Sequence, residues 1–380
     1  METLTKYLVH DKLSPLNSGV GGGTLDGKAM RTIAWDYTHQ QIRMIDQRLL
    51  PGEFREVSFT SYEQVAEAIQ QMVVRGAPAI GAAAAFGMVL AAYASTTSDI
   101  KVFKGEMTKA GNALEAARPT AVNLAWAIAR MLRVVEQYET GEIDALKGEM
   151  LEEAQHIADQ DVLINKQMAT YGANLMGNDE TVIHHCNTGA LATVDWGTAL
   201  GVIRMAHEQG KNPHVLVDET RPRLQGARLT AWELEQYQVS YEIITDNSAG
   251  FFLSSGKIDR VLVGADRVAA NGDVANKIGT YMLALAARDN QVPFFAVVPT
   301  STVDLSLEEG KQIPIEERDP GEVLGIQFLG KRASPETAKA RNPAFDITPH
   351  RLITGIITEN GVVNPPFERN LRQAVLAGRS

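Results

Sequence analysis

Residues 214–222 are HVLVDETRP and residues 260–267 are RVLVGADR. Each stretch begins with a short, mostly apolar segment of strand length and then turns abruptly polar. Three more apolar segments of this kind occur nearby, at residues 182–185, 241–244 and 293–298. Segments with helical spacing separate them, and this alternation predicts an α/β fold with a parallel sheet covered by helices on both faces. The expected helices are residues 198–208, 228–236, 250–255 and 274–288.

The first half of the chain has a different pattern. Residues 31–59 alternate enough to predict short antiparallel strands, with turns near Thr38-His39 and Pro51-Gly52. Ser61 and Gln64 have the spacing of a helix capping box. Further helices are expected at residues 65–73, 79–94, 107–117, 122–138 and 143–175. We therefore expect a smaller domain of strands and a helical bundle at 31–174, a second domain at 175–380, and a flexible extension at 1–30.

Composition narrows the classes of function. The formal net charge of −10 argues against an extended nucleic-acid interface, which would need a basic face. One cysteine, Cys186, allows no intramolecular disulfide and no cysteine zinc cluster, and it fits a cytoplasmic protein. The start of the chain has no signal-peptide pattern. The longest apolar run, residues 78–94, is shorter than the roughly 20 residues of a membrane span, so we expect a buried helix and no membrane partner.

Polar groups follow four of the expected strands. Cys186, Asp218, Asp246 and Asp266 each lie just beyond the apolar segment that precedes them. Because parallel sheets bind ligands at the carboxyl ends of their strands, four such segments predict a site on this edge. Each residue also has a structural interpretation. Cysteine is commonly a small buried apolar residue, and an aspartate can cap a helix or, for Asp266, pair with the neighbouring Arg267.

Other catalytic signals are weak. His184 and His185 alternate about a strand, so at least one is expected to pack inside, and neither is assigned a catalytic role. No spacing of histidine and carboxylate residues indicates a metal site. Neither a phosphate-binding loop of the G-x-x-x-x-G-K-[ST] type nor a G-x-S-x-G elbow is present.

Three segments have the properties of a phosphate site. Asn276 and Lys277 are expected to open a helix, where free N–H groups and a full positive charge would meet a phosphate. Arg75, followed by Gly76 and Ala77, precedes an Ala-rich helix, and Arg118 stands at a second helix break. The alternative for a lysine at a helix start is that it is simply solvated.

Seven segments of the chain, several of them described above, together resemble the methylthioribose-1-phosphate isomerases of the translation-initiation-factor 2B α/β/δ-like superfamily. Each segment is weak evidence alone, but seven in the family order are specific. They are VRGAPAIG (74–81), RPTAVNL (118–124), HCNTGALAT (185–193), ETRP with QG (219–226), GADR with NKIGT (264–280), IPIEER (313–318) and NPAFD (342–346). The first 30 residues and the charged stretch 331–341 depart from the family pattern.

The resemblance implies a Rossmann-like C-terminal domain, a smaller N-terminal domain and a homodimer that uses no cofactor and no metal. It implies that Cys186 and Asp266 form the catalytic pair. It also implies the residues that hold the substrate and its phosphate, namely Arg75, Gly76, Ala77, Arg118, Gln225, Asn276 and Lys277. The implied reaction is an aldose–ketose isomerisation in methionine salvage, from S-methyl-5-thio-α-D-ribose 1-phosphate to S-methyl-5-thio-D-ribulose 1-phosphate.

Three alternatives stay open. Related isomerases act on ribose 1,5-bisphosphate or 5-deoxyribose 1-phosphate, which differ from the methylthio sugar at C5. Regulatory subunits of the exchange factor for translation initiation share the implied fold and act by binding. A nicotinamide dehydrogenase is disfavoured because the glycine fingerprint is absent.

Overall fold

The structure, a computed structural model, describes residues 31–119, 121–139 and 141–377, which form two compact units. The first unit contains the described residues up to Ile164 and the segment Gly189–Gly197. The second contains Asn165–Thr188 and the described residues from Thr198 onward. The domain boundary expected from the sequence, between residues 174 and 175, differs from this division at residues 165–174 and 189–197. The expected extension, residues 1–30, lies outside the described residues.

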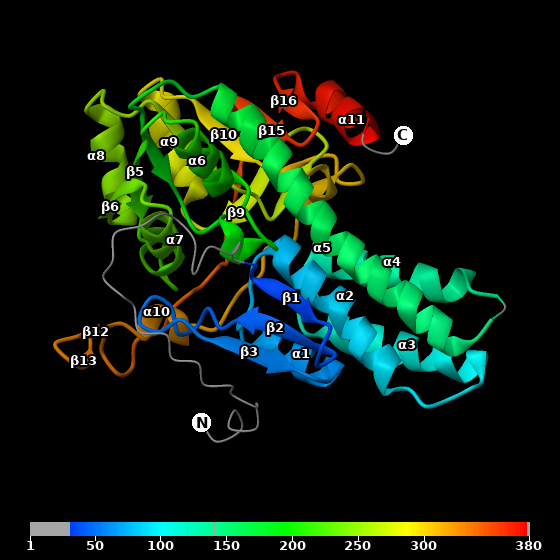
Figure 1. Cartoon of the computed structure of the whole chain (residues 1–380). Helices are drawn as coiled ribbons and strands as arrows, with labels where there is room; N and C mark the ends of the chain where they lie inside the picture. The colour runs from blue at the N-terminus through cyan, green and yellow to red at the C-terminus, as the bar shows by residue number, and fades with distance from the viewer. Residues whose placement is uncertain (1–30, 120, 140, 378–380) are drawn as a thin grey trace. The chain divides into compact units, whose positions relative to one another are not determined.

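The first unit begins with the expected antiparallel sheet. Its strands are β1 (Ile33–Asp36), β2 (Gln41–Ile45) and β3 (Glu56–Phe59), with β2 in the middle (Figure 1). Ile33 pairs with Met44, and Ile42 pairs with Phe59, so apolar residues fill one face. That face packs into the core of this unit.

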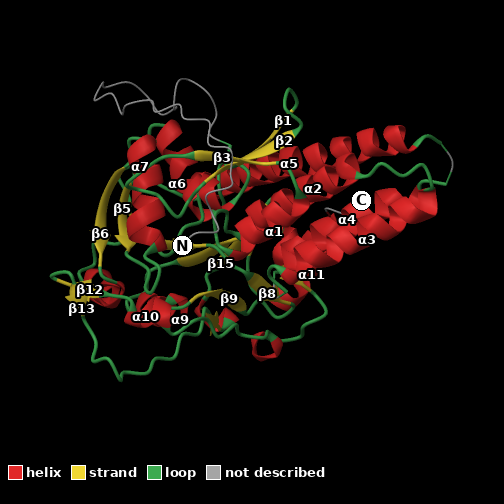
Figure 2. Ribbon diagram, turned by 90° about the horizontal axis from the view of Figure 1, so that it is seen from below, coloured by secondary structure: helices red, strands yellow, loops and turns green. Residues whose placement is uncertain are grey.

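Five helices follow, close to the expected ranges: α1 (Tyr62–Gln70), α2 (Ala77–Ala94), α3 (Ile100–Ala116), α4 (Val122–Gln137) and α5 (Ile143–Asn174). The predicted capping box of Ser61 and Gln64 is confirmed at the start of α1. Helix α2 packs against α1, α3 and α4, and Figure 2 shows α3 beside α4. Among the described helices, α2 alone is long and apolar enough to cross a membrane, but 78% of it is buried, as expected of a core helix.

The segment Gly189–Gly197 folds into the first unit although the residues on either side belong to the second. Thr32 Oγ1 donates to the Ala190 carbonyl (2.6 Å) and Gln47 Nε2 donates to the Leu191 carbonyl (2.6 Å). The carboxylate of Asp161 accepts the N–H of Val194 at 2.7 Å. These long-range bonds fix a segment that local sequence patterns do not distinguish from a loop.

The second unit contains the predicted parallel sheet. Its order is β16-β15-β10-β7-β4-β5-β6, and the pairs from β15 to β6 are all parallel. The strands are β4 (Thr181–His184), β5 (His214–Asp218), β6 (Ser240–Ile244), β7 (Arg260–Val263), β10 (Phe294–Val297), β15 (Gly355–Thr358) and β16 (Gly361–Val363). The chain runs outward from β4 to β6 and then returns to the other side of β4 with β7. The β4–β7 junction is therefore the point where the strand order reverses, the usual ligand position in such sheets.

The helices of this unit are α6 (Ala199–Glu208), α7 (Ala231–Gln236), α8 (Ala249–Ser254), α9 (Thr280–Asp289), α10 (Gly321–Leu324) and α11 (Phe367–Ala377). A π-helical turn, Gly226–Thr230, leads into α7. A hairpin of β12 (Gln327–Phe328) and β13 (Lys331–Arg332) lies beyond α10 (Figure 2). The last two strands of the main sheet, β15 and β16, were not predicted.

One predicted helix is wrong in its first part. Residues 274–288 were expected to be helical throughout, but Val274–Lys277 is strand β9. It belongs to a second sheet of order β11-β8-β9-β14, with β8 (Arg267–Ala269), β11 (Val303–Asp304) and β14 (Phe345–Thr348). Pairing with β14, about 70 residues later, determines the strand, and Gly279 at φ +105° separates it from α9.

Candidate functional site

Cys186 follows β4 at the point where the strand order reverses. It is buried, and its backbone has φ +70°, a conformation that non-glycine residues seldom adopt. Its N–H donates to Thr220 Oγ1 (2.9 Å), and its carbonyl accepts from Thr230 Oγ1 (2.7 Å). Both threonines are fully buried. Two hydroxyls from different elements therefore hold Cys186 in an uncommon backbone conformation.

Thr220 also connects the ends of β5 and β6. Its N–H donates to Asp246 Oδ1, and the N–H of Arg221 donates to Asp246 Oδ2, both at 2.7 Å. Its hydroxyl donates to the carbonyl of Asp218 (2.9 Å). A Cβ on Gly226 would lie 1.7 Å from that same carbonyl, so only glycine fits there. Asp246 thus has a structural role in shaping this edge.

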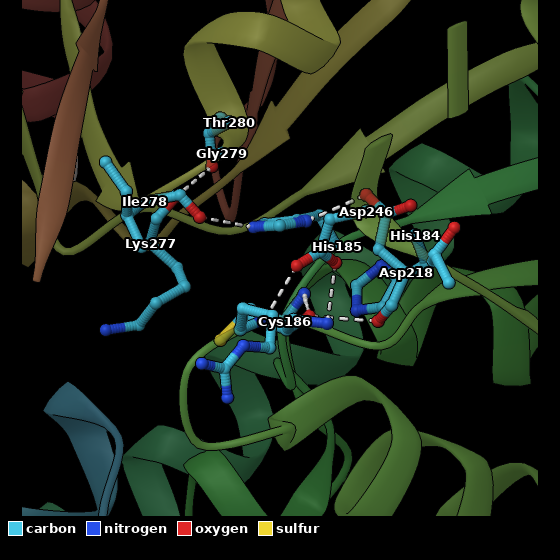
Figure 3. Close-up of polar contacts among 12 residues, drawn as sticks. His184, His185, Cys186, Asp218, Asp246, Lys277, Ile278, Gly279 and Thr280 are labelled. Atoms are coloured by element: carbon cyan, nitrogen blue, oxygen red, sulfur yellow. Dashed lines mark hydrogen bonds and ion pairs between the residues drawn. The ribbon is translucent and has the colours of Figure 1, made fainter. Parts of the chain in front are cut away.

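The histidine at the end of β4 links three segments of the second unit. Nδ1 of His185 lies 2.8 Å from Asp218 Oδ2, and Nε2 lies 2.9 Å from the Ile278 carbonyl (Figure 3). Burial alone would lower the pKa of His185, but the hydrogen bond and charge of Asp218, with Asp246 nearby, raise it above its usual 6.5. Burial likewise raises the pKa of Asp218, although its bond to His185 opposes the shift.

These three side chains form a cluster of the type that can bind a metal. One ligand atom from each of His185, Asp218 and Asp246 lies within 4.8 Å of the others. The hydrogen bonds above already account for the arrangement, because Asp246 accepts two backbone N–H groups and His185 contacts Asp218 directly. Asp218 and Asp246 were expected at this edge of the sheet from the ends of their strands, whereas His185 was assigned no catalytic role.

Asp266 follows β7, the strand that pairs with β4. Its N–H donates to the Ala275 carbonyl at 2.9 Å, and its residue is partly buried. The neighbouring Arg267 lies 3.8 Å from Asp304. Cys186 and Asp266 therefore lie just beyond two adjacent parallel strands, which are about 4.8 Å apart in such sheets.

The prediction that Asn276 and Lys277 form a phosphate site at the start of a helix is wrong in its secondary structure. Asn276 and Lys277 lie in β9, and α9 begins only at Thr280. The N–H groups of Gly279 and Tyr281 at that helix start donate to Asp346 (2.8 and 3.0 Å), so a carboxylate of the chain occupies the position expected for phosphate.

Lys277 is the last residue of β9. Its Nζ donates to the Ala344 carbonyl (3.0 Å) and lies 4.6 Å from the centre of the Phe345 ring. Asn276 Nδ2 donates to Thr280 Oγ1 (3.0 Å). In Figure 3, the side chains of Lys277 and Cys186 extend to the same side of His185.

Gln225 is buried at the start of the π-helical turn, and within the described part of the chain its Oε1 has no hydrogen-bond partner. The loop that precedes Gln225 is held by side chains from a segment about 100 residues later in the chain. Glu322 accepts from Arg223 (2.9 Å), Arg318 (3.0 Å) and Asn342 (3.0 Å). Burial alone would raise the pKa of Glu322, but these bonds lower it to about 2.

The remaining predicted binding residues lie in the first unit. Gly76 is the N-cap of α2 at φ +98°, and a Cβ there would lie 2.2 Å from the Ala192 carbonyl. Arg75 and Ala77 flank it and are partly buried. Arg118 follows α3, and its N–H donates to the Glu115 carbonyl. The predicted helix start after Arg75 is therefore confirmed.

Comparison with known proteins gives consistent results. The model of the Initiation factor 2 subunit family matches residues 73–365. A methylthioribose-1-phosphate isomerase of Thermosipho africanus is 52% identical over 90% of this chain and 98% of its own length. The isomerase of Acetivibrio thermocellus is 48% identical over 89% and 98%.

Solved structures give the same family as the sequence comparisons. The crystal structure of 5-methylthioribose 1-phosphate isomerase from Pyrococcus horikoshii OT3 superposes with a TM-score of 0.85, at 48% identity, over 92% of this chain and 97% of that chain. A structure described as translation initiation factor eIF-2B, subunit delta, from A. fulgidus gives 0.81 at 40% identity, over 92% and 100%. The chain therefore belongs to the Initiation factor 2 subunit family and, within it, to the methylthioribose-1-phosphate isomerases, which are aldose–ketose isomerase enzymes.

Proposed function

We propose that the chain converts S-methyl-5-thio-α-D-ribose 1-phosphate to S-methyl-5-thio-D-ribulose 1-phosphate in methionine salvage, with Cys186 and Asp266 as the catalytic pair. One observation carries the proposal. Both residues lie just beyond β4 and β7, adjacent strands at the reversal of strand order, where such sheets bind their ligands. The names of the similar isomerases support the substrate.

The chemistry requires two groups that can exchange protons. The anomeric oxygen of the substrate carries phosphate, so the ring cannot open as a free aldose does. The enzyme must protonate or polarise the ring oxygen and move hydrogen from C2 to C1, which leaves a carbonyl at C2. A carboxyl group and a thiol beyond adjacent strands can divide these tasks between them. Asp266 is suited to the acid role if substrate binding excludes water from it.

The substrate and its phosphate would be held by Arg75, Gly76, Ala77, Arg118, Gln225, Asn276 and Lys277. Lys277 supplies a positive charge on the side of the strand ends to which Cys186 extends (Figure 3). The buried Oε1 of Gln225 can accept a hydrogen bond from a sugar hydroxyl. Arg75 precedes the N-terminus of α2, where backbone N–H groups favour an anion.

We also propose that the enzyme is a cytoplasmic homodimer. Helices α8 and α9 pack together and expose large apolar side chains, with Phe251 72%, Met282 65% and Leu285 39% accessible. Large apolar side chains exposed on two helices that pack together are candidates for an interaction surface. The single cysteine is a free thiol, which suits a reducing compartment.

The catalytic pair is tested by Cys186→Ser and Asp266→Asn. Each variant should lower kcat by at least about 100-fold, the scale of a removed acid–base group, while circular dichroism shows an unchanged fold. Asp179→Asn makes the same chemical change at an exposed position between α5 and β4 and should keep full activity. Turnover near the wild-type rate in either site variant would refute the assigned pair.

A further inference from the structure

The ring of His185 is surrounded by hydrogen-bond acceptors. Nε2 lies 2.9 Å from the Ile278 carbonyl, which can only accept, so Nε2 carries a hydrogen. A neutral ring would then have a bare lone pair on Nδ1, directed at Asp218 Oδ2 2.8 Å away. Two lone pairs cannot face each other at that distance without a proton between them. Either His185 is doubly protonated or Asp218 carries the proton, and both states have the same total number of protons.

Burial makes this proton hard to remove. His185 and Asp218 are about 1% and 0% exposed, and Asp218 Oδ1 has no partner within the described residues. An isolated carboxylate in such a place would be costly, whereas a pair that is neutral overall is not. Within the described residues, the charged groups around this pair include Asp246, Asp346 and Glu219, and His184 lies beside His185. The pKa of His184 is lowered by burial to about 4, so that ring adds no positive charge at neutral pH.

The pair lies against both segments that carry the proposed site. Cys186 is the residue after His185, and Lys277 is the residue before Ile278, whose carbonyl accepts from the ring. A Cβ on Gly279 would lie 2.9 Å from His185 Cε1, so the backbone after Lys277 rests directly on the ring. Figure 3 shows the ring between the Ile278 carbonyl and the aspartate side chains.

We propose that His185 and Asp218 hold one proton between them at neutral pH, and that this net-neutral pair positions the backbone segments bearing Cys186 and Lys277. The assignment of these two segments to the active site rests on the proposed function. His185 and Asp218 are positioning residues, since neither is placed on the reacting atoms. At alkaline pH, loss of the shared proton would leave the lone pair of His185 Nδ1 facing the Asp218 carboxylate. Their repulsion would displace both segments.

The direct test needs no substrate. Protein labelled with ¹⁵N in its eight histidines and with ¹³C in aspartate is examined by NMR from pH 6 to 9. The His185 signals are assigned by their loss in His185→Gln. A protonated Nδ1 supports the proposal, and so does a bare Nδ1 with Asp218 in the carboxylic acid form. A bare Nδ1 beside an ionised Asp218 throughout this range overturns it.

Kinetics test the positioning role. Asp218→Asn keeps a donor to Nδ1 without a removable shared proton, whereas Asp218→Ala removes the contact and should lower kcat by roughly tenfold or more. The wild type should lose kcat at the pH where the NMR signals titrate, and Asp218→Asn should lack that limb. His350→Gln removes the ring from another His–Asp pair and should leave the profile unchanged. If kcat of Asp218→Asn has the same pH dependence as kcat of the wild type, and the variant differs only in the amount of active enzyme, the positioning role is refuted. Absence of turnover in the wild type would instead refute the proposed function and leave the NMR result valid.

Discussion

The strained backbone at Cys186 makes Thr230→Val an informative substitution. Valine has nearly the same shape as threonine but no hydroxyl. The change removes the bond from Thr230 Oγ1 to the Cys186 carbonyl (2.7 Å) and the bond from Asn187 Nδ2 to Thr230 Oγ1 (3.2 Å). Asn187 keeps a second acceptor, Glu233 Oε1 at 2.8 Å. The Cys186 carbonyl is therefore the group that loses most.

The expected loss of unfolding free energy follows from these bonds. The loss of a hydrogen bond to a buried carbonyl costs about 2 kcal/mol, and the weaker amide bond adds about 1 kcal/mol, so we expect roughly 3 kcal/mol. Holding a non-glycine residue at φ +70° costs on the order of 1 kcal/mol or more, so the released backbone will relax at Cys186. We therefore expect kcat to fall by about tenfold or more even where the variant is fully folded.

The assay combines urea unfolding with kcat measured at 25 °C. Thr170→Val is the matched control, because its hydroxyl donates to Lys166 on an exposed turn of α5 and its loss should cost less than about 0.5 kcal/mol. A Thr230→Val variant as stable and as active as the control would show that the hydroxyl does not hold Cys186.

Three further changes test other parts of the site. Gly226→Ala should prevent normal folding of the loop, because the new Cβ would lie 1.7 Å from the Asp218 carbonyl, and a wild-type melting temperature would contradict this. Lys277→Ala should raise KM about tenfold or more with little change in kcat, and an unchanged KM would exclude Lys277 from phosphate binding. Glu322, with its pKa lowered from 4.5 to about 2, stabilises the fold above about pH 4.5, and this contribution is lost as the pH falls toward 2. Glu322→Gln should therefore be less stable at pH 7 and lose less stability between pH 5 and 3, as urea unfolding at each pH will show.

Local sequence patterns predicted much of the fold because most strands of the main sheet are recognisable from their own residues and the turns beside them. The strands β4, β5, β6, β7 and β10 are short apolar segments bounded by polar turns, and each was placed within about one residue at either end. The placement of Cys186 and Asp266 beyond two of these strands followed from the same pattern. That β4 and β7 are neighbours depends on topology, which the sequence pattern does not contain.

The errors and omissions share a long-range cause. Val274–Lys277 has a spacing that also suits a helix, and only pairing with Phe345–Thr348 makes it a strand. Thr230 holds the carbonyl of Cys186 from 44 residues away, so no local motif indicates its role. His185 is the first residue of the recognised segment HCNTGALAT, but its importance depends on Asp218 and on the Ile278 carbonyl.

The proposed reaction is the isomerisation of a sugar 1-phosphate with a methylthio group at C5. The most direct measurement is turnover of a panel of three purified substrates, S-methyl-5-thioribose 1-phosphate, ribose 1,5-bisphosphate and 5-deoxyribose 1-phosphate, followed by the appearance of the ketose. We predict that the methylthio sugar phosphate has the highest kcat/KM and that its product is the corresponding ribulose 1-phosphate. A folded enzyme that does not convert this substrate would contradict the proposal, whether it prefers another sugar of the panel or converts none.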